Sequence, residues 1–264
     1  MPDGLRLALT TLTVAPVRGP TTLDRRTAGR AMELAPAVGL ALGLAAGAVL
    51  FALRVLSPER SSGPLLPCAL AVATLAVLTR GLHLDGLADL TDGLASYRDP
   101  AGARAVMKSP EVGALGVVAV VLVVLVQVTA LASCVQAGRG TASLLLAVAS
   151  GRLAVTCACR GTPAAAPTGL GALVAGTVRR GVPGAWATGL AIGFAAYATV
   201  DPDAAGGPWE RVLRTLLAVT VALLLARALR AHAVRRTGGL TGDLLGALSE
   251  LATTACLVVL ATGS

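Results

Sequence analysis

Long apolar runs are the feature that most restricts how this chain can fold. Each run is close to the roughly 20 apolar residues that an α-helix needs to cross the hydrocarbon core of a bilayer. The runs occupy residues 33–53, 64–79, 113–136, 141–159, 184–200, 211–231 and 240–262. Only 14% of the 264 residues are charged, whereas soluble domains average roughly a quarter. The pattern predicts an all-α, polytopic transmembrane helical bundle of about seven spans rather than an apolar soluble bundle.

The chain is expected to form one domain. No linker long enough to separate two domains, and no repeat at a fixed period, interrupts the apolar runs. The first thirty residues are basic but lack the apolar block and small-residue cleavage site of a secretory signal peptide. We therefore predict a single integral membrane domain over residues 1–264.

The basic residues are distributed unevenly between alternate loops. With seven spans, the N-terminal segment and the loops at 80–112, 160–183 and 227–239 share one side and hold sixteen of the 22 Lys and Arg residues. The opposite side holds Arg54, Arg60, Arg139, Arg211 and Arg214. Because cytoplasmic loops carry the basic excess, the N-terminus is predicted to be cytoplasmic. The net charge of +8 then reflects topology and contact with anionic membrane lipid. It does not indicate nucleic-acid binding, which pairs basic side chains with aromatic ones.

Three aspartates stand close together in the run GLHLDGLADLTDGL, residues 81–94. Their spacing of i, i+4 and i+7 places Asp85, Asp89 and Asp92 in one stripe on a helix. No basic residue lies between positions 80 and 98 to offset their repulsion. A shared divalent cation would do so, and hard oxygen ligands suit Mg²⁺ or Mn²⁺. Gly86 and Gly93 would let a phosphate approach the backbone. The alternative is a solvated acidic helix face.

A second pair of acids lies in the last apolar run, within GGLTGDLLGALSE at residues 238–250. Asp243 and Glu250 are seven residues apart and therefore share a helix face, with Glu250 about 10 Å deeper at 1.5 Å per residue. Gly242 and Gly246 form a small-xxx-small step that permits close helix contact. Asp243 could be a helix-end acid favoured by the dipole. Glu250 is more difficult to explain without a function, since acids at membrane depth are costly.

Two further side chains suit phosphate chemistry. Arg152 lies inside the fourth span, where it either snorkels to the interface or faces the acids or an anionic substrate. His83 precedes Asp85 by two residues, so the two side chains do not share a helix face. His83 could contact a phosphate or accept a proton, or it could serve only in packing.

The two acidic runs resemble motifs of the cobalamin synthase family, the integral membrane adenosylcobinamide-GDP ribazoletransferases. That family has a G-x-H-L-D-G-L-A-D-x-x-D-G run and a later G-G-x-T-G-D-x-x-G-A-x-x-E run, and both are nearly intact here. Shorter similarities occur in PAVGLALG (36–43), SGRLA (150–154) and GLGAL (169–173). The chain departs from the family at Val14, where an arginine is common, and at Glu111 in the loop SPEVG.

The resemblance implies a late step of vitamin B12 assembly at the bacterial cytoplasmic (inner) membrane, with the active site facing the cytoplasm. The enzyme would join adenosylcobinamide-GDP to α-ribazole, or to its 5′-phosphate, and release GMP with Mg²⁺ as cofactor. Carboxylates that hold one or two metals neutralise the transferring phosphoryl group. The metal ligands would be Asp85, Asp89, Asp92, Asp243 and Glu250. The phosphate contacts would be Lys108, Arg152, Arg179 and Arg180, with Gly86 and Gly93. One carboxylate, or His83, would accept the hydroxyl proton.

Other functions fit the sequence less well. A CDP-alcohol phosphotransferase of lipid synthesis also places spaced aspartates at a membrane face, but Ser96 stands where its opening motif needs arginine. An ion-coupled transporter would show two related halves, and none is evident. A structural subunit would not explain three acids on one face. Abundant small residues permit close helix association, so a homo-oligomer is compatible with the sequence.

Overall fold

The computed structural model describes residues 1–56, 63–200 and 207–262. Its helices are α1 (Asp3–Leu12), α2 (Arg25–Glu33), α3 (Ala35–Leu56), α4 (Leu65–Leu78), α5 (Leu82–Ala95), α6 (Pro100–Met107), α7 (Ala114–Gln136), α8 (Gly140–Ala158), α9 (Leu170–Val174), α10 (Val182–Val200), α11 (Pro208–Thr237) and α12 (Gly242–Ala261). The described residues form no β-strand, only an isolated parallel bridge between Ala164 and Leu240. The predicted all-α architecture is confirmed.

Five of these helices are long and apolar enough to cross a membrane, namely α3, α7, α8, α11 and α12. A sixth candidate is the pair α4 and α5, whose axes differ by 86° at a short break. Every one of the seven apolar runs forms a helix, but the runs at 64–79 and 184–200 become α4 and α10, which are not among these five. Residues 1–56, 63–200 and 207–262 therefore contain five or six candidate membrane spans. Arg60, which was assigned to the less basic side, lies outside the described residues.

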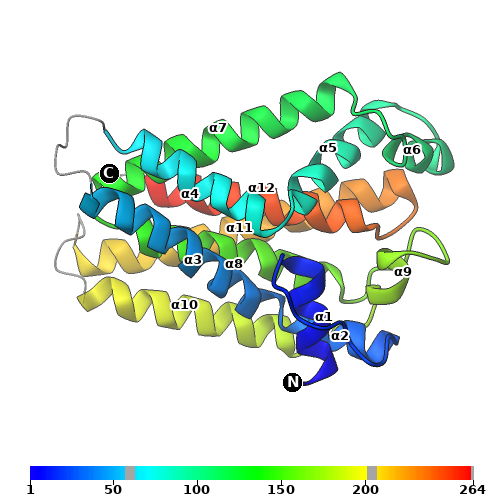
Figure 1. Cartoon of the computed structure of the whole chain (residues 1–264), viewed down its shortest axis with the longest axis horizontal. Coiled ribbons are helices and arrows are strands. Elements are labelled where there is room, and N and C mark those ends of the chain that lie inside the picture. Colours follow the sequence, from blue (N-terminus) through cyan, green and yellow to red (C-terminus); the bar gives the residue numbers. More distant parts are fainter. Residues whose placement is uncertain (57–62, 201–206, 263–264) are drawn as a thin grey trace.

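Short helices gather at one end of the bundle. The long helices run along the long axis of the molecule, and α1, α2, α5, α6 and α9 all lie toward the same end, on the right in Figure 1. Helix α12 ends at the opposite end of the bundle (Figure 1). Both acidic motifs, in α5 and at the start of α12, are therefore located at the end that carries the short helices.

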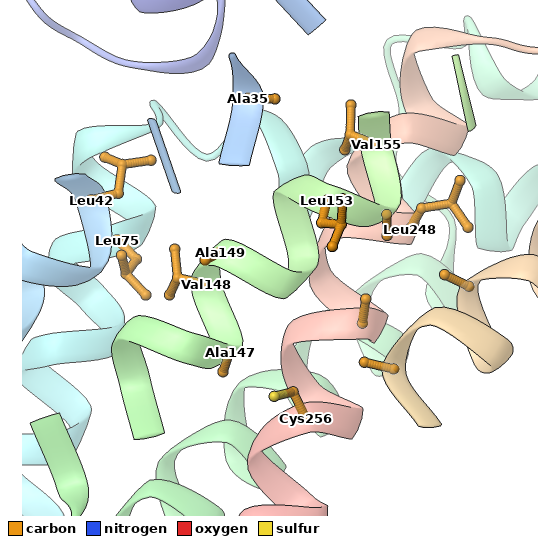
Figure 2. Packing of buried hydrophobic residues seen from close by; sticks show 14 of the residues in the cluster. Ala35, Leu42, Leu75, Ala147, Val148, Ala149, Leu153, Val155, Leu248 and Cys256 are labelled. Atoms are coloured by element: carbon orange, nitrogen blue, oxygen red, sulfur yellow. The ribbon is translucent and has the colours of Figure 1, made fainter. Parts of the chain in front are cut away.

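Helix α8 is the centre of the packing, and nearly all of its residues are buried. Figure 2 shows Ala147, Val148, Ala149, Leu153 and Val155 of this helix among side chains of its neighbours. Helix α3 packs against it through glycines spaced four residues apart. A Cβ at Gly39 would lie 3.0 Å from the Cα of Ala149, and one at Gly43 would lie 2.9 Å from the Cα of Leu145. Such close approach of backbones is how helices associate by van der Waals contact in a membrane.

The outer surface of the bundle is apolar. Helix α7 exposes one face of large aliphatic side chains, namely Val117, Val118, Val121, Leu122 and Leu125. An exposed apolar face of this length is unusual for a soluble protein but is the expected surface toward lipid tails. The outward apolar face and the buried small-residue seams together support the membrane class predicted from the sequence.

Candidate active site

The turn between α4 and α5 directs the aspartate motif away from the bundle axis. Arg80 and Gly81 adopt left-handed backbone conformations, with φ of 55° and 67°. Glycine adopts this conformation without penalty, whereas a residue with a Cβ rarely does so. The Arg80 guanidinium donates a hydrogen bond to the carbonyl oxygen of Thr10 at 3.2 Å, which attaches the turn to α1. Helix α5 therefore leaves α4 at a steep angle and crosses α12.

Two glycines bring α5 and α12 into direct backbone contact. A Cβ added to Gly86 would lie 2.8 Å from the carbonyl oxygen of Asp243 and 2.9 Å from its Cα. A Cβ added to Gly246 would lie 3.1 Å from the Cα of His83. The distances at Gly86 are too short for any side chain, and the distance at Gly246 is tighter than most Cβ contacts in proteins, so glycine at both positions permits the close approach of the two helices. The contact places the start of α12 beside the aspartates of α5.

Three carboxylates lie near this contact and interact through their charges, from Asp85 and Asp89 on α5 and from Asp243 on α12; we call them the seam carboxylates. Asp85 is exposed and the other two are half-buried. None of the three accepts a hydrogen bond or forms an ion pair with any described residue. Burial, followed by the charges of Asp85, Asp243 and Asp92, raises the pKa of Asp89 to about 6. The carboxylates are therefore close enough to repel one another.

The other two predicted ligands, Asp92 and Glu250, are held by the protein; we call them the anchored carboxylates. The Asp92 carboxylate accepts hydrogen bonds from the backbone N–H groups of Gly113 at 2.7 Å and Gly116 at 2.9 Å, at the start of α7. It therefore caps that helix from a neighbouring one. The Glu250 carboxylate accepts a hydrogen bond from the side-chain amide of Gln127 at 2.9 Å. No group of three or more His, Cys, Asp or Glu side chains in the described residues is already arranged to share one metal ion.

A cavity of about 310 Å³ opens beside the seam carboxylates, and Asp85, Asp243 and His83 line it. His83 is only 3% exposed, and its Nδ1 has no hydrogen-bond partner among the described residues. Burial, and then the positive charge of Arg152, lowers the pKa of His83 well below its usual value. The imidazole is therefore neutral at physiological pH and can accept a proton or a hydrogen bond from a ligand in the cavity.

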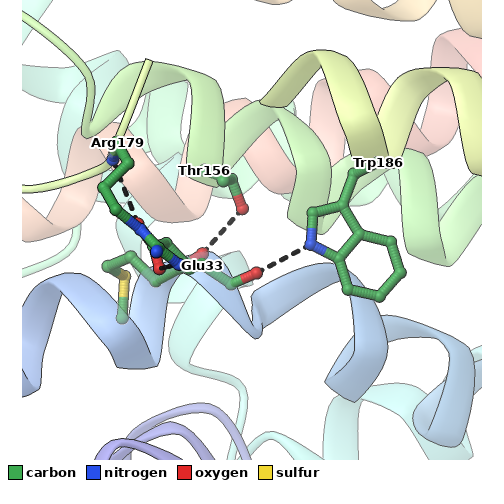
Figure 3. Close-up of polar contacts among 5 residues, drawn as sticks. Glu33, Thr156, Arg179 and Trp186 are labelled. Atoms are coloured by element: carbon green, nitrogen blue, oxygen red, sulfur yellow. Dashed lines mark hydrogen bonds and ion pairs between the residues drawn. The ribbon is translucent and has the colours of Figure 1, made fainter. Parts of the chain in front are cut away.

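The predicted basic residues fall into two groups. Lys108 follows α6, and its charge is close enough to act on Asp243. Arg152 is 2% exposed inside the bundle, and its Nε lacks a partner in the described part of the chain. Arg179, in contrast, is paired with Glu33 (Figure 3). Arg180 lines a different cavity from the one beside the seam carboxylates.

Protein atoms fill the space next to the two glycines predicted to admit a phosphate. The nearest neighbours are the Asp243 backbone at Gly86 and the Met107 side chain, whose Cγ would be 2.5 Å from a Cβ, at Gly93. Both glycines are buried. The structure therefore gives Gly86 and Gly93 a role in packing, and through it in placing the carboxylates.

A profile of the cobalamin-5-phosphate synthase family matches residues 4–261. The chain belongs to this family. Relatives named adenosylcobinamide-GDP ribazoletransferase include proteins of Frankia casuarinae, 50% identical with 97% of this chain and 93% of the relative covered, and of Nocardioides sp., 42% identical with 98% of each covered. A third, from Corynebacterium efficiens, is 37% identical over 93% of this chain and 86% of its own length. No solved structure matches.

The match confirms that the two acidic runs mark a member of the cobalamin-5-phosphate synthase family. The structure adds residues of this member that the sequence did not single out. Gln127, which binds Glu250, is a buried amide inside an apolar run, a signal that sequence reading could have used. Thr11 and Met32 line the cavity from α1 and α2, and neither carries a signal in the sequence, because their position depends on how the N-terminal helices fold back.

Proposed function

We propose that this chain transfers the adenosylcobinamide phosphate group from adenosylcobinamide-GDP to a hydroxyl of α-ribazole, or of α-ribazole 5′-phosphate, and releases GMP. Membership of the cobalamin-5-phosphate synthase family over nearly the whole chain supports the reaction. The observation that carries the assignment to a site is that Asp85 and Asp243 line one cavity where the glycine contact joins α5 to α12, and that Asp89 is close enough for its charge to interact with both.

The reaction exchanges one phosphorus–oxygen bond for another. The ribazole hydroxyl oxygen attacks the phosphorus next to the cobinamide, and the bond from that phosphorus to the oxygen of the GMP phosphate breaks. The hydroxyl proton passes to a base, and GMP leaves with the bonding electron pair. Neutral His83 at the cavity wall, or a seam carboxylate, accepts the proton. Lys108 and Arg152 stabilise negative charge that develops on the phosphate oxygens.

We infer that Mg²⁺ is the cofactor and that the seam carboxylates hold it. Their donor set supports this, because three carboxylates without protein hydrogen-bond donors offer the hard oxygen ligands that Mg²⁺ prefers. The anchored carboxylates fit less well as direct ligands, since backbone and side-chain amides already bind Asp92 and Glu250. When bound, a divalent cation supplies charge neutralisation to a phosphoryl group and its leaving group.

We further propose that the bundle crosses the bacterial cytoplasmic membrane seven times, through α3, α4, α7, α8, α10, α11 and α12. In this topology the N-terminus and the short helices face the cytoplasm, where nucleotide substrates are found. The uneven distribution of the 22 Lys and Arg residues supports the orientation. The apolar outer face supports contact with membrane lipid, and the many small residues would permit a homo-oligomer.

The decisive test measures GMP release from adenosylcobinamide-GDP by the purified full-length protein with α-ribazole and Mg²⁺. We expect Asp85→Asn, Asp89→Asn and Asp243→Asn each to lower turnover more than about tenfold, because one charged ligand of the cation is lost. The matched control is Asp99→Asn. Asp99 caps α6 by accepting a hydrogen bond from the Gly102 N–H at 3.0 Å, a role that asparagine also performs. Wild-type turnover in all three seam variants would refute the assignment.

A further inference from the structure

A second and larger cavity, of about 890 Å³, lies between α8, α11 and the segment that precedes α10. It is separate from the cavity beside the seam carboxylates. The acid-lined cavity contacts Val155 of α8 and Leu245 of α12, whereas this one contacts Ala154 of α8 and Leu248 of α12. Five arginines line it, and we call it the arginine pocket: Arg160, Arg179, Arg180, Arg227 and Arg230.

Of these five guanidinium groups, one is neutralised by an acid in the part of the chain that the structure describes. Arg179 forms an ion pair with Glu33 at 2.7 Å and also donates to it through Nε and the backbone N–H (Figure 3). The same segment is held by the Trp186 indole, which donates to the Glu33 carbonyl oxygen at 2.8 Å (Figure 3). The ion pair lowers the pKa of Glu33, chiefly through the hydrogen bond from Arg179. The positive charge of Arg179 is therefore already balanced by the Glu33 carboxylate.

The remaining four arginines carry unbalanced positive charge. Arg160, Arg180 and Arg227 are exposed and form no ion pair or side-chain hydrogen bond with the described residues. Arg230 makes two long hydrogen bonds, to the Cys157 carbonyl oxygen at 3.5 Å and to Thr162 Oγ1 at 3.3 Å. None of the residues that line the pocket is acidic. An anion, and above all a phosphate group with several oxygens, is the ligand that such a cluster of guanidinium groups attracts.

The pocket also has a polarity gradient along α11. Arg227 and Arg230 are one helical turn apart near the C-terminal part of this helix, and Leu223 and Leu224 line the same pocket one turn earlier. Leu224 is 60% exposed, so an apolar surface continues from the pocket onto the outer face of the bundle. A ligand that fits both parts has a phosphate group joined to an apolar chain.

We propose that the arginine pocket binds an anionic phospholipid, with its phosphate among Arg160, Arg227 and Arg230 and its acyl chains along Leu223 and Leu224. Basic pockets between membrane helices are the usual binding sites for anionic headgroups. A soluble phosphate compound would use the same arginines but would leave the exposed leucines without a partner. Leu223 and Leu224 therefore favour a phospholipid over a soluble phosphate compound as the ligand. Binding there would fix the segment before α10 to α8 and α11.

The test compares lipid binding by native mass spectrometry of the purified full-length protein in a nonionic detergent, with phosphatidylglycerol and phosphatidylcholine added in equal amounts. We expect the wild-type protein to retain phosphatidylglycerol in about tenfold excess. The triple variant Arg160→Gln, Arg227→Gln, Arg230→Gln should lose this preference and retain the two lipids in about equal amounts, because the charges that attract the anionic headgroup are removed. The single variant Arg227→Gln, in which an exposed side chain changes, gives the same readout with little risk to folding.

The control variant is Arg18→Gln, Arg98→Gln, Arg235→Gln. It changes the net charge by the same amount, but none of these arginines lines the pocket. It should keep the preference for phosphatidylglycerol. Equal binding of the two lipids by the wild-type protein, or equal loss in both triple variants, would overturn the proposal. So would displacement of phosphatidylglycerol by added α-ribazole 5′-phosphate, which would assign the pocket to a soluble phosphate. Bound lipid is measured without turnover, so the outcome does not depend on the proposed reaction.

Discussion

The seam carboxylates and the anchored carboxylates come from the same two sequence motifs but have opposite surroundings. Among the described residues, the charges that act on Asp89 and Asp243 are those of other aspartates and of Lys108. Asp92 receives two backbone N–H groups, and Glu250 receives the amide of Gln127. A carboxylate that protein donors already stabilise gains less from a cation than one that is repelled by its neighbours. The comparison therefore separates the acids that we propose to hold the cation from acids that already have hydrogen-bond donors within the protein.

The glycine contact is what creates the seam, so the largest effect should follow from disturbing it. In Gly86→Ala the new Cβ would lie 2.8 Å from the Asp243 carbonyl oxygen, and a backbone atom cannot move aside without shifting a helix. A displacement of about 1 Å at a reacting centre can reduce a rate about a hundredfold. We expect GMP release to fall by about that factor. Gly246→Ala, with a Cβ 3.1 Å from the His83 Cα, should show a smaller loss.

The control for this pair is Gly189→Ala on α10, where a Cβ would meet nothing within 4 Å. It should leave GMP release unchanged, since alanine favours a helix more than glycine does. Thermal melting of each variant shows whether the bundle remains folded. If Gly86→Ala is folded and as active as Gly189→Ala, the close approach of α5 and α12 is not what positions the carboxylates.

Much of the fold could be predicted from composition and periodicity. Apolar runs of about span length located every long helix, because the bilayer sets that length. The i, i+4 spacing correctly placed Asp85 and Asp89 together, since neighbours on one helix face are fixed by local geometry. The steep turn at Arg80 and Gly81 could not be predicted, because the backbone conformation there depends on contacts with α1.

The roles of the acids could be predicted less well than the helices, because these roles also depend on tertiary contacts. Asp92 continues the stripe of Asp85 and Asp89, but its carboxylate binds backbone amides that follow it by 21 and 24 residues. Arg179 was expected to hold phosphate, and its partner Glu33 lies 146 residues away in the chain. Periodicity describes one helix at a time, whereas hydrogen bonds between helices depend on the tertiary arrangement. Gln127, an amide in an apolar run, was the readable indication that Glu250 has a protein partner.

A change of pH should have an intermediate effect on the apparent affinity for Mg²⁺, exerted through the seam carboxylates. Because the pKa of Asp89 is raised to about 6, this group takes up a proton as the pH falls through that value. A proton and Mg²⁺ then compete for the same oxygens. For one competing proton, the apparent affinity for Mg²⁺ should be about fourfold weaker at pH 5.5 than at pH 7.5. Titration of GMP release with Mg²⁺ at both pH values measures this ratio, and an unchanged affinity would contradict the placement of Asp89 among the ligands.

The smallest effect on turnover is expected from Asp92→Asn, which tests the other side of the comparison. Asparagine keeps an oxygen that can accept a hydrogen bond from Gly113 or Gly116, so α7 stays capped. Loss of the charge at a helix N-terminus lowers the free energy of unfolding by about 1 kcal/mol. We expect GMP release to stay within about threefold of wild type, with a small decrease in melting temperature. A loss as large as that of Asp85→Asn, at unchanged melting temperature, would move Asp92 from the anchored carboxylates to the metal ligands.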